Sequence, residues 1–207
     1  MEKSIALILA WPETKCKQAG AWYDGITHWL GFSKEGYYRV GHAAIALVDG
    51  RNGIVKYFDF GRYHAPHGHG RVRDEETDWE LAVNTVVQWE NGIPLNLNEL
   101  VDELQANKAC HGDGKMEVGI LPIDFEKSFA KALVMQSEEF WVYGPFVKKG
   151  TNCSRFVRSV AVAGSKKPFR SVKMNLPWML SPTPMWNVVS GYSINNYLSK
   201  QNSKRTQ

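Results

Sequence analysis

The feature that most constrains the fold of this chain is the stretch of residues 151–164 (TNCSRFVRSVAVAG), whose apolar side chains repeat with helical spacing. One face of the helix would collect the apolar positions Cys153, Phe156, Val157, Val160, Ala161 and Gly164. Either Thr151 or Asn152 can cap the first turn, and Gly164 suits the left-handed residue that ends many helices. The pattern predicts an amphipathic helix whose inward face starts with Cys153.

The position of Cys153 at a helix start bears on its chemistry. Unpaired backbone amides and the positive end of the helix dipole favour a thiolate, and the thiolate is the nucleophilic form of cysteine. Most buried cysteines, however, are small apolar core residues. Position alone leaves a reactive thiol and a core residue equally open.

A single histidine in an otherwise apolar run offers a base for that thiol. Residues 37–48 predict a strand in which His42 directly follows Gly41. The missing side chain at Gly41 leaves room for a substrate or for another backbone. The turn signal of residues 49–53 (DGRNG) leads into a second strand-like run, residues 54–61, so the two runs predict a hairpin.

The register of this hairpin decides which polar residue meets the histidine. If Val48 pairs with Ile54, the partner of His42 lies near Phe60, and Asp59 is one residue away. Because alternate strand residues point to opposite faces, Asp59 then reaches the imidazole only through a shift of register or a tilt of the strand. Asp59 is the predicted residue to orient the histidine.

Two motifs together resemble a known family. Gly41-His42, followed later by the NCSRFV of residues 152–157, resembles the circularly permuted NlpC-like branch of the papain-like cysteine hydrolases, which includes lecithin:retinol acyltransferase and its phospholipid-acting relatives. The resemblance spans roughly residues 37–164. It implies a papain-like fold, in which a small antiparallel sheet packs with helices and the nucleophile stands at a helix N-terminus.

The resemblance also implies catalytic roles. Cys153 would be the nucleophile and His42 the base, with Asp59 in the third place that fixes the imidazole tautomer. Tyr57 and His64 are alternatives for that third place. The acyltransferase relatives carry a second histidine where this chain offers Asp59, so amide or ester hydrolysis is favoured over lipid acyl transfer.

Aromatic and basic residues near these motifs are candidates for substrate binding. Trp141 and Tyr143 lie shortly before the cysteine helix, where they can line a pocket or simply belong to the core. In the loop between the strands, Arg62, His64 and Arg71 can meet a substrate, the arginines through a carboxylate or phosphate.

The same loop invites a metal-binding interpretation. His64, His67 and His69 are closely spaced, and Cys110 with His111 could complete a tetrahedral site. No carboxylate or cysteine lies within the loop itself, which favours a surface turn. The prediction is therefore no metal and no cofactor.

The rest of the chain mixes helices and strands. The remaining predicted elements are a buried strand ending at Trp11, a short helix or loop at residues 20–31, a segment at 77–91 that could be helix or strand and weakly favours helix, a helix at 96–107, a strand at 116–123, a helix at 125–138 capped by Asp124, and an irregular stretch at 176–191. Helices on either side of a small sheet predict the α+β class. We expect one domain over residues 1–198 and a disordered tail at 199–207.

Composition limits the class of partner. The net charge of +4 comes without a basic helix or a nucleic-acid motif, so no nucleic-acid partner is predicted. The apolar run near the N-terminus is too short for a membrane span and lacks a cleavage site, so we expect no stable membrane insertion. The three cysteines show no disulfide framework. A cytoplasmic location is predicted, although a specialised secretion route would leave the same signature.

Three functional hypotheses remain at this stage. The first is a thiol hydrolase that cleaves an amide, peptide or ester bond through an acyl-enzyme, with cell-wall peptides among its candidate substrates. The second is a non-catalytic binding module on the same fold, and the third is a lipid acyltransferase or thioesterase. The predicted partner is accordingly a peptide, amide or lipid-ester substrate.

Overall fold

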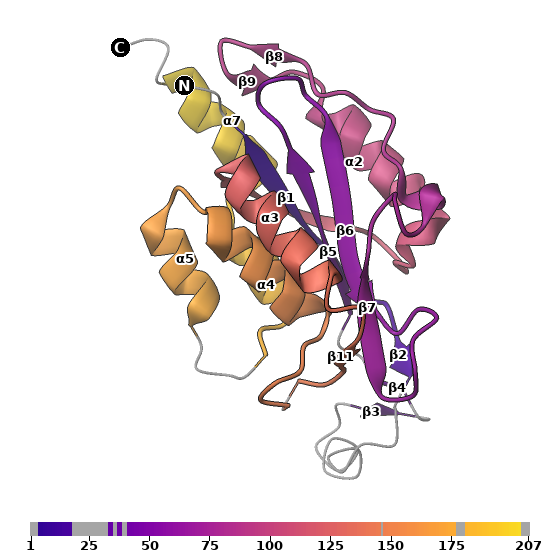
Figure 1. Ribbon diagram of the computed structural model, residues 1–207. Helices are drawn as coiled ribbons and strands as arrows, with labels where there is room; N and C mark the ends of the chain where they lie inside the picture. Colours follow the sequence, from indigo (N-terminus) through magenta and orange to yellow (C-terminus); the bar gives the residue numbers. More distant parts are fainter. Residues whose placement is uncertain are drawn as a thin grey trace.

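The protein is built around one antiparallel sheet of six strands, seen in a computed structural model that describes residues 4–17, 33–34, 37–38, 41–145, 147–176 and 181–203 (Figure 1). The strand order is β10-β1-β5-β6-β7-β11. These strands are β1 (Ile5–Trp11), β5 (His42–Val48), β6 (Val55–Gly61), β7 (His69–Arg73), β10 (Glu117–Pro122) and β11 (Trp141–Val142). The antiparallel sheet with its flanking helices confirms the predicted α+β class.

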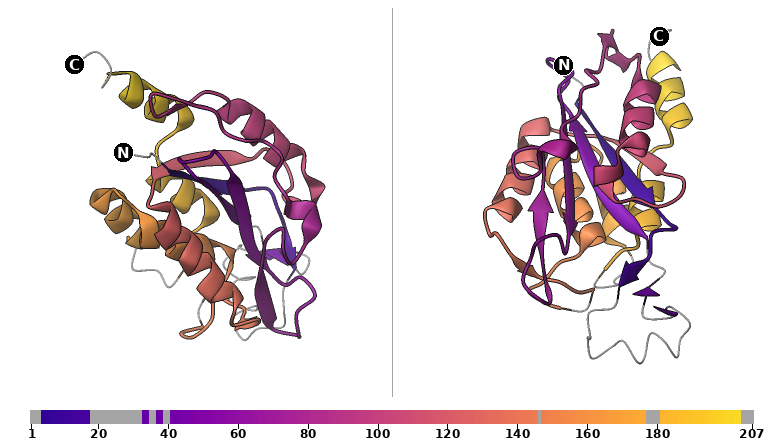
Figure 2. Two further views of the ribbon diagram at one scale, coloured as in Figure 1. Left: turned by 45° about the horizontal axis from the view of Figure 1, so that its top comes forward. Right: turned by 90° about the vertical axis from the view of Figure 1, so that its right-hand side faces the viewer.

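Helices cover both faces of the sheet, as the turned views show (Figure 2). The helices are α2 (Leu97–Ala106), α3 (Phe125–Gln136), α4 (Cys153–Gly164), α5 (Pro168–Asn175), α6 (Pro184–Ser190) and α7 (Ile194–Ser203). Short strand pairs add β2 (Cys16–Lys17), β3 (Ser33–Lys34), β4 (Tyr37–Tyr38), β8 (Trp89–Glu90) and β9 (Ile93–Pro94). Two 3₁₀ turns occupy Trp79–Leu81 and Lys108–Cys110.

The two central strands are continuous apolar runs because both of their faces are covered. Every residue of β1 and β5 is buried. On one face, Ile45 and its neighbours pack against Phe156 and Val157 of α4. On the other face, Leu7 packs in a cluster with Leu100 of α2. A strand between two helical layers loses the alternation of polar and apolar residues that marks a half-exposed strand.

The β5–β6 hairpin differs from the predicted register by one residue. Val48 pairs with Val55, and Ile54 belongs to the turn, where its carbonyl accepts from the Asp49 amide at 2.9 Å. Ala44 therefore pairs with Asp59. Because His42 lies two residues before Ala44 and side chains alternate, His42 and Asp59 share one face of the sheet.

Several predicted elements are confirmed with small changes in their ends. The buried N-terminal strand is β1, the strand at 116–123 is β10, and the helices at 96–107 and 125–138 are α2 and α3. The Asp124 side chain accepts from the Lys127 amide at 3.2 Å, as its predicted cap role requires. The strand expected over residues 37–48 is split into β4 and β5. The segment predicted at residues 20–31 lies outside the described residues.

Other predictions were wrong for local reasons. The segment at 77–91 forms one 3₁₀ turn and the short strand β8, and not the helix that was weakly favoured over a strand. The stretch at 176–191 contains α6, because Thr183 caps the helix and Pro184 fits its first turn. Helix α7 continues through residues 199–203, which were expected to be disordered, while residues 204–207 lie outside the described part.

Gly164 has a different role from the predicted left-handed helix end. It is the last residue of α4 and it has no positive φ. A Cβ atom there would lie 2.2 Å from Ser128 Oγ and 2.4 Å from the Asp124 carbonyl oxygen. Gly164 therefore allows the close approach of α4 to α3.

Candidate active site

The histidine of the site is fixed at the first residue of β5. Gly41, just before it, has a φ of +76°, and a Cβ there would lie 2.8 Å from the Trp11 carbonyl oxygen. The space left by Gly41 is thus used by the backbone of the neighbouring strand. The Trp11 indole stacks on the His42 ring with 5.8 Å between centroids, so the imidazole is 5% exposed and held in one plane.

Asp59 faces this histidine from β6. Its Oδ2 lies 3.6 Å from His42 Nε2, slightly beyond hydrogen-bond length. Arg73 of β7 binds the same carboxylate with two hydrogen bonds, from Nε at 2.9 Å and from an η nitrogen at 2.6 Å. The Tyr57 hydroxyl adds a third donor at 3.3 Å. Burial raises the pKa of Asp59, but His42 and Arg73 outweigh burial and hold the pKa below its usual value.

The cysteine comes from the layer of helices on the other side of β5. Cys153 is the first residue of α4, and the Asn152 side chain caps the helix by accepting from the Arg155 amide at 2.9 Å. The thiol is 6% exposed and meets His42 and the amide of Ala43. His42 is the first residue of β5, so a side chain from the other face of the sheet can reach it around the end of the strand.

The electrostatics of the cysteine and histidine favour an ion pair. Burial lowers the pKa of His42, but the Asp59 carboxylate and the Cys153 thiolate outweigh it and raise the pKa to about 9. Burial raises the pKa of Cys153, but His42 outweighs it and holds the pKa below the ordinary thiol value. Since Nε2 faces Asp59, Nδ1 is the ring nitrogen left for the sulfur. The two shifts together favour a thiolate beside an imidazolium.

Comparison with known proteins identifies the family to which the chain belongs. A family model described as type VI secretion system effector TseH-like matches residues 6–169. The chain belongs to this TseH-like family. A crystal structure of the type VI secretion system effector TseH is similar to this chain with a TM-score of 0.57 and 16% identity, over 92% of this chain and 88% of that one. A search of curated proteins found no match.

The structural likeness to TseH concerns the fold, and the α+β fold described above is consistent with a papain-like one. Neither comparison involves the branch that contains lecithin:retinol acyltransferase, so that part of the resemblance stays a prediction. In the part of this TseH-like chain that the structure describes, no helix has the length and apolarity needed to cross a membrane.

Of the predicted substrate-binding residues of this TseH-like protein, Tyr143 lies near the Cys153 thiol and Arg62 lies over the Tyr143 ring. Tyr143 stacks on Phe60 with 5.9 Å between ring centroids, and the Arg62 guanidinium lies 5.2 Å from the centre of the Tyr143 ring. Burial raises the pKa of Tyr143 well above its ordinary value, and the charge of Cys153 adds to this. Cys16 lies in the same region, where its thiol contacts the Gly41 carbonyl oxygen at 3.6 Å.

The other predicted binding residues are directed elsewhere. Trp141 donates from Nε1 to the Met135 carbonyl at 2.8 Å, which ties the indole to α3. His64 is exposed, with a φ of +48°. Arg71 bonds the Tyr63 carbonyl and Asp78, so its charge is used within the loop.

The residues of the metal-binding interpretation are not gathered. Among the residues that the structure describes, no three His, Cys, Asp or Glu side chains are close enough to hold a metal ion. His69 Nδ1 instead lies 3.0 Å from the His67 carbonyl oxygen. The His111 ring stacks on Tyr63 with 4.9 Å between centroids.

Sequence reasoning missed Arg73 and Trp11. Arg73 pairs with Asp59 in the β6–β7 register, so extending the hairpin argument by one more strand would have found an opposite-charge cross-strand pair. Trp11 pairs with His42 across β1 and β5, but no local sequence signal joins residues so far apart. Both residues hold the histidine and carboxylate without touching the thiol in the contacts described.

Proposed function

We propose that this TseH-like chain is a cysteine hydrolase that opens an amide bond through an acyl-enzyme, with Cys153 as nucleophile, His42 as acid and base, and Asp59 as the residue that orients His42. The observation that carries the proposal is the meeting of these three side chains in one buried cluster. A cluster of three polar groups inside a core is costly unless the groups interact favourably. Here Asp59 binds Arg73 and Tyr57, and His42 lies between Asp59 and Cys153.

The geometry supports a definite sequence of steps. The Cys153 thiolate attacks the carbonyl carbon, and the C=O electron pair moves onto oxygen. His42 gives its proton to the departing amine, and the carbonyl reforms as a thioester. His42, now neutral, takes a proton from water as the water attacks the thioester, and the acid product leaves with the thiolate restored.

Two further features of the site support this chemistry. The amide of Cys153 lies at the N-terminus of α4, where an unpaired N–H can stabilise the oxyanion. Asp59 keeps His42 charged and fixes its ring, while Arg73 and Tyr57 hold Asp59 itself. The carboxylate can therefore act on the imidazole without rotating away.

The substrate class that we propose is the peptide part of the bacterial cell wall. The support is membership in a family of secretion effectors, together with a thiolate–imidazolium pair suited to amides. An effector is delivered outside the cell that makes it, so we propose export in place of the expected cytoplasmic residence. The competing hypotheses are that the site acts on a lipid ester, or that it binds a ligand without turnover.

The first test is the rate of iodoacetamide alkylation of each cysteine against pH. Cys153 is expected to react well below the roughly 8.5 pKa of a free thiol, and to lose that advantage in His42→Ala. His67→Ala is the matched control, because His67 lies on the exposed loop. Equal reactivity of Cys153 and Cys110, or no effect of His42→Ala, would contradict the nucleophile assignment.

The second test measures new amino groups released from purified peptidoglycan. Cys153→Ala is expected to abolish release, by at least about 10³-fold, because removal of a nucleophile leaves only residual catalysis. His67→Ala should retain full activity. A reactive Cys153 that releases no amine from peptidoglycan, but releases fatty acid from phospholipid, would replace the peptide assignment by the lipid one.

A further inference from the structure

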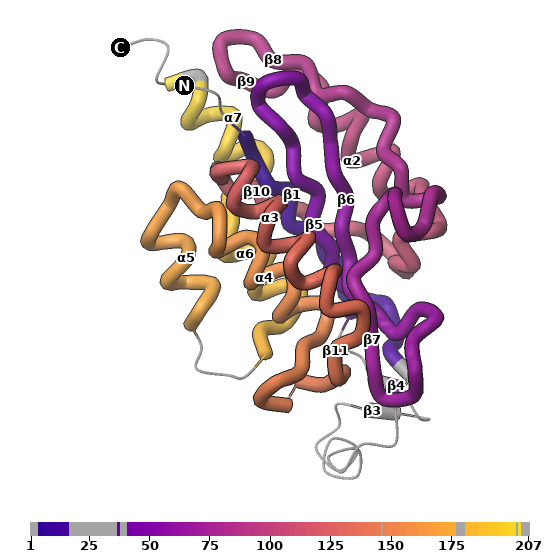
Figure 3. The backbone as a smooth tube through the Cα atoms, viewed as in Figure 1, coloured from indigo at the N-terminus to yellow at the C-terminus, as the bar shows by residue number. Residues whose placement is uncertain are grey.

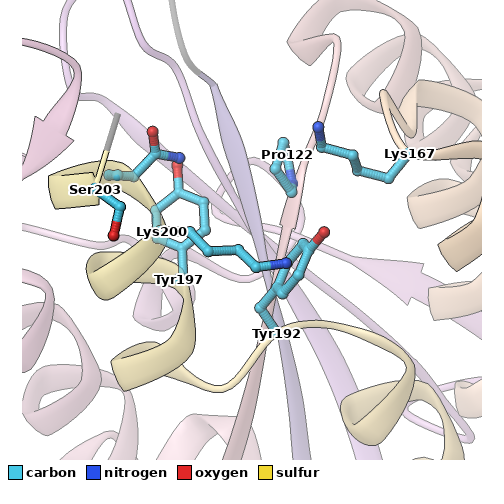
Figure 4. Close-up of a pocket in the computed structure, with 7 residues that line it drawn as sticks. Pro122, Lys167, Tyr192, Tyr197, Lys200 and Ser203 are labelled. Carbon is cyan, nitrogen blue, oxygen red and sulfur yellow. The ribbon is translucent and has the colours of Figure 1, made fainter. Parts of the chain in front are cut away.

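A pocket lies at the far end of the sheet from the thiol. It has a volume of about 350 Å³ and opens between β10, the start of α5 and helix α7 (Figure 4). Pro122, which lines it, pairs with Ile5 at one end of β1, while His42 pairs with Trp11 at the other end. Six residues of strand separate these positions, or about 20 Å. Helix α7 lies beside this end of β1 in the backbone trace (Figure 3).

The pocket is lined by cations around one phenol. Lys167 and Lys200 both line it, and the Lys200 ammonium lies 4.6 Å from the centre of the Tyr192 ring. Arg170 stands on the same ring at 4.0 Å, and its guanidinium is fixed by the Gly191 carbonyl at 2.6 Å. Two positive charges, one from α5 and one from α7, therefore lie against the Tyr192 ring, and Lys167 at the start of α5 adds a third charge to the pocket region.

No carboxylate lines this pocket within the described residues. The nearest acidic side chains along the chain after Pro122 already have cationic partners. Asp124 pairs with Lys127 at 3.8 Å, and Glu126 pairs with Arg51 at 2.6 Å. The lysines of the pocket are thus not neutralised by these two carboxylates.

The phenols show the effect of this charge. Burial raises the pKa of Tyr192, but Arg170, Lys200 and Lys167 outweigh burial and lower it. Burial raises the pKa of Tyr197 to about 12, so this wall of the pocket stays neutral. The positive potential is therefore concentrated where Tyr192 and the two lysines meet.

We propose that this pocket binds a phosphate-type oxyanion, with the ammonium groups of Lys167 and Lys200 as its charged ligands and the Tyr192 hydroxyl as a hydrogen-bond donor. Arg170, which lies over the Tyr192 ring, can only donate hydrogen bonds, so the phenol proton is left for a ligand. The volume admits a phosphate together with a small organic group, and the ring of Tyr197 supplies an apolar wall. The phosphate belongs either to a soluble monoester or to a lipid headgroup. The site is independent of the thiol chemistry proposed above.

The test is a titration of the full chain with inorganic phosphate near neutral pH, at constant ionic strength, followed by calorimetry and amide NMR shifts. We expect saturable binding of one phosphate per chain. The double variant Lys167→Gln/Lys200→Gln should weaken binding by at least about tenfold, because two charge-assisted contacts are lost. The matched variant Lys148→Gln/Lys149→Gln removes the same charge from an exposed turn and should leave binding unchanged.

Binding that does not saturate, or that weakens equally in both double variants, would overturn the site, because either result reflects net charge alone. Glycerol phosphate and vesicles of phosphatidylglycerol in phosphatidylcholine then separate the two sources. Saturable glycerol phosphate binding without vesicle sedimentation assigns a soluble ligand. Sedimentation that free phosphate inhibits, and that the pocket double variant loses, assigns the headgroup. Peptidoglycan cleavage by the pocket variant should stay normal, so failure here and failure of the hydrolase proposal remain distinguishable.

Discussion

The two ends of the β1–β5 strand pair hold their charges in opposite ways. At the His42 end, Asp59 is fully buried and Arg73 binds it with an η nitrogen at 2.6 Å. At the Pro122 end, Lys167 is half-buried, Lys200 is exposed, and no carboxylate joins them among the described lining residues. One end neutralises its own charges, and the other presents charge to solvent.

This difference has a physical cause. A charge taken out of water must be paired inside the protein, so a buried cluster carries its counter-charges with it. A charge at the surface is hydrated, so it needs no counter-charge within the protein and is free to bind an external partner. The closed end thus suits chemistry on an uncharged bond, whereas the open end suits binding of an anion, with a strength that falls as salt rises.

The largest expected effect comes from removing one cation at each end. Arg73→Met should lower the free energy of unfolding by about 3–5 kcal/mol, because the Asp59 carboxylate is left buried without its main partner. Lys200→Met, the matched change at the open end, should alter it by less than about 0.5 kcal/mol. Urea denaturation of both variants measures the difference.

The effect of Arg73→Met on the free energy of unfolding should depend on pH in a definite direction. Asp59 has a lowered pKa in the folded protein, so its pairing stabilises the fold above the ordinary carboxyl pKa and is lost as the pH falls through the lowered one. The deficit of Arg73→Met should therefore shrink in acid. An equal loss in Arg73→Met and Lys200→Met would mean that the closed end is not held by its ion pair.

A smaller but sharper effect is expected on the pH profile of catalysis. His42 has a pKa raised to about 9, so its proton is available to the leaving group below that pH and is lost above it. Asp59→Asn removes the carboxylate that supports this value, and the alkaline limb should move from near pH 9 toward the roughly 6.5 of free histidine. The stability that charged His42 contributes is complete below roughly pH 6.5 and is lost as the pH rises through about 9.

The control variant for this profile is Lys200→Gln, which also changes the net charge by one unit, although in the opposite direction. Because Lys200 lies at the other end of the sheet, its charge acts on His42 only through a long-range field. In Lys200→Gln, the alkaline limb of kcat/KM should stay in place. If the alkaline limb of kcat/KM does not shift in Asp59→Asn, another group holds the proton on His42, and the role assigned to Asp59 is wrong.

How far the sequence alone could lead differs between elements. The cysteine helix follows from local periodicity, and its start at Cys153 follows from the Asn152 cap. The hairpin was also evident, but its register depended on whether Ile54 belongs to the turn, and one residue decides which face Asp59 occupies. Local pattern therefore identified Cys153 and His42 more firmly than the third residue.

The rest depends on contacts between distant segments. Arg73 could be found as the partner of Asp59 only by extending the hairpin argument to a third strand, and nothing near Trp11 in the sequence marks it as the ring beneath His42. The pocket at the Pro122 end is lined by residues from separate segments of the chain, among them Pro122, Lys167 and Tyr192. The sequence analysis used only the net charge, and a charge count does not reveal which cations lie together.

The smallest expected effect contrasts two helix caps at the two ends of the molecule. Asn152 caps α4 beside the thiol, and Asp124 caps α3 near the Pro122 end. Asn152→Ala and Asp124→Ala should each reduce the free energy of unfolding by about 1 kcal/mol, since each leaves one helix amide without its acceptor. Only Asn152→Ala should also slow the alkylation of Cys153, because fraying of the first turn of α4 displaces the sulfur from His42.

The two measurements, urea denaturation and alkylation rate, separate stability from chemistry. If both variants slow alkylation equally, the thiol responds to global stability and not to the local geometry of its helix start. If neither does, the first turn of α4 is held by other contacts, such as the 2.8 Å hydrogen bond from Asn187 to the Ser154 carbonyl. A slower alkylation of Cys153 in Asn152→Ala alone would show that the reactivity of the thiol depends on the few residues that begin α4. The buried site would then be held by its own local contacts.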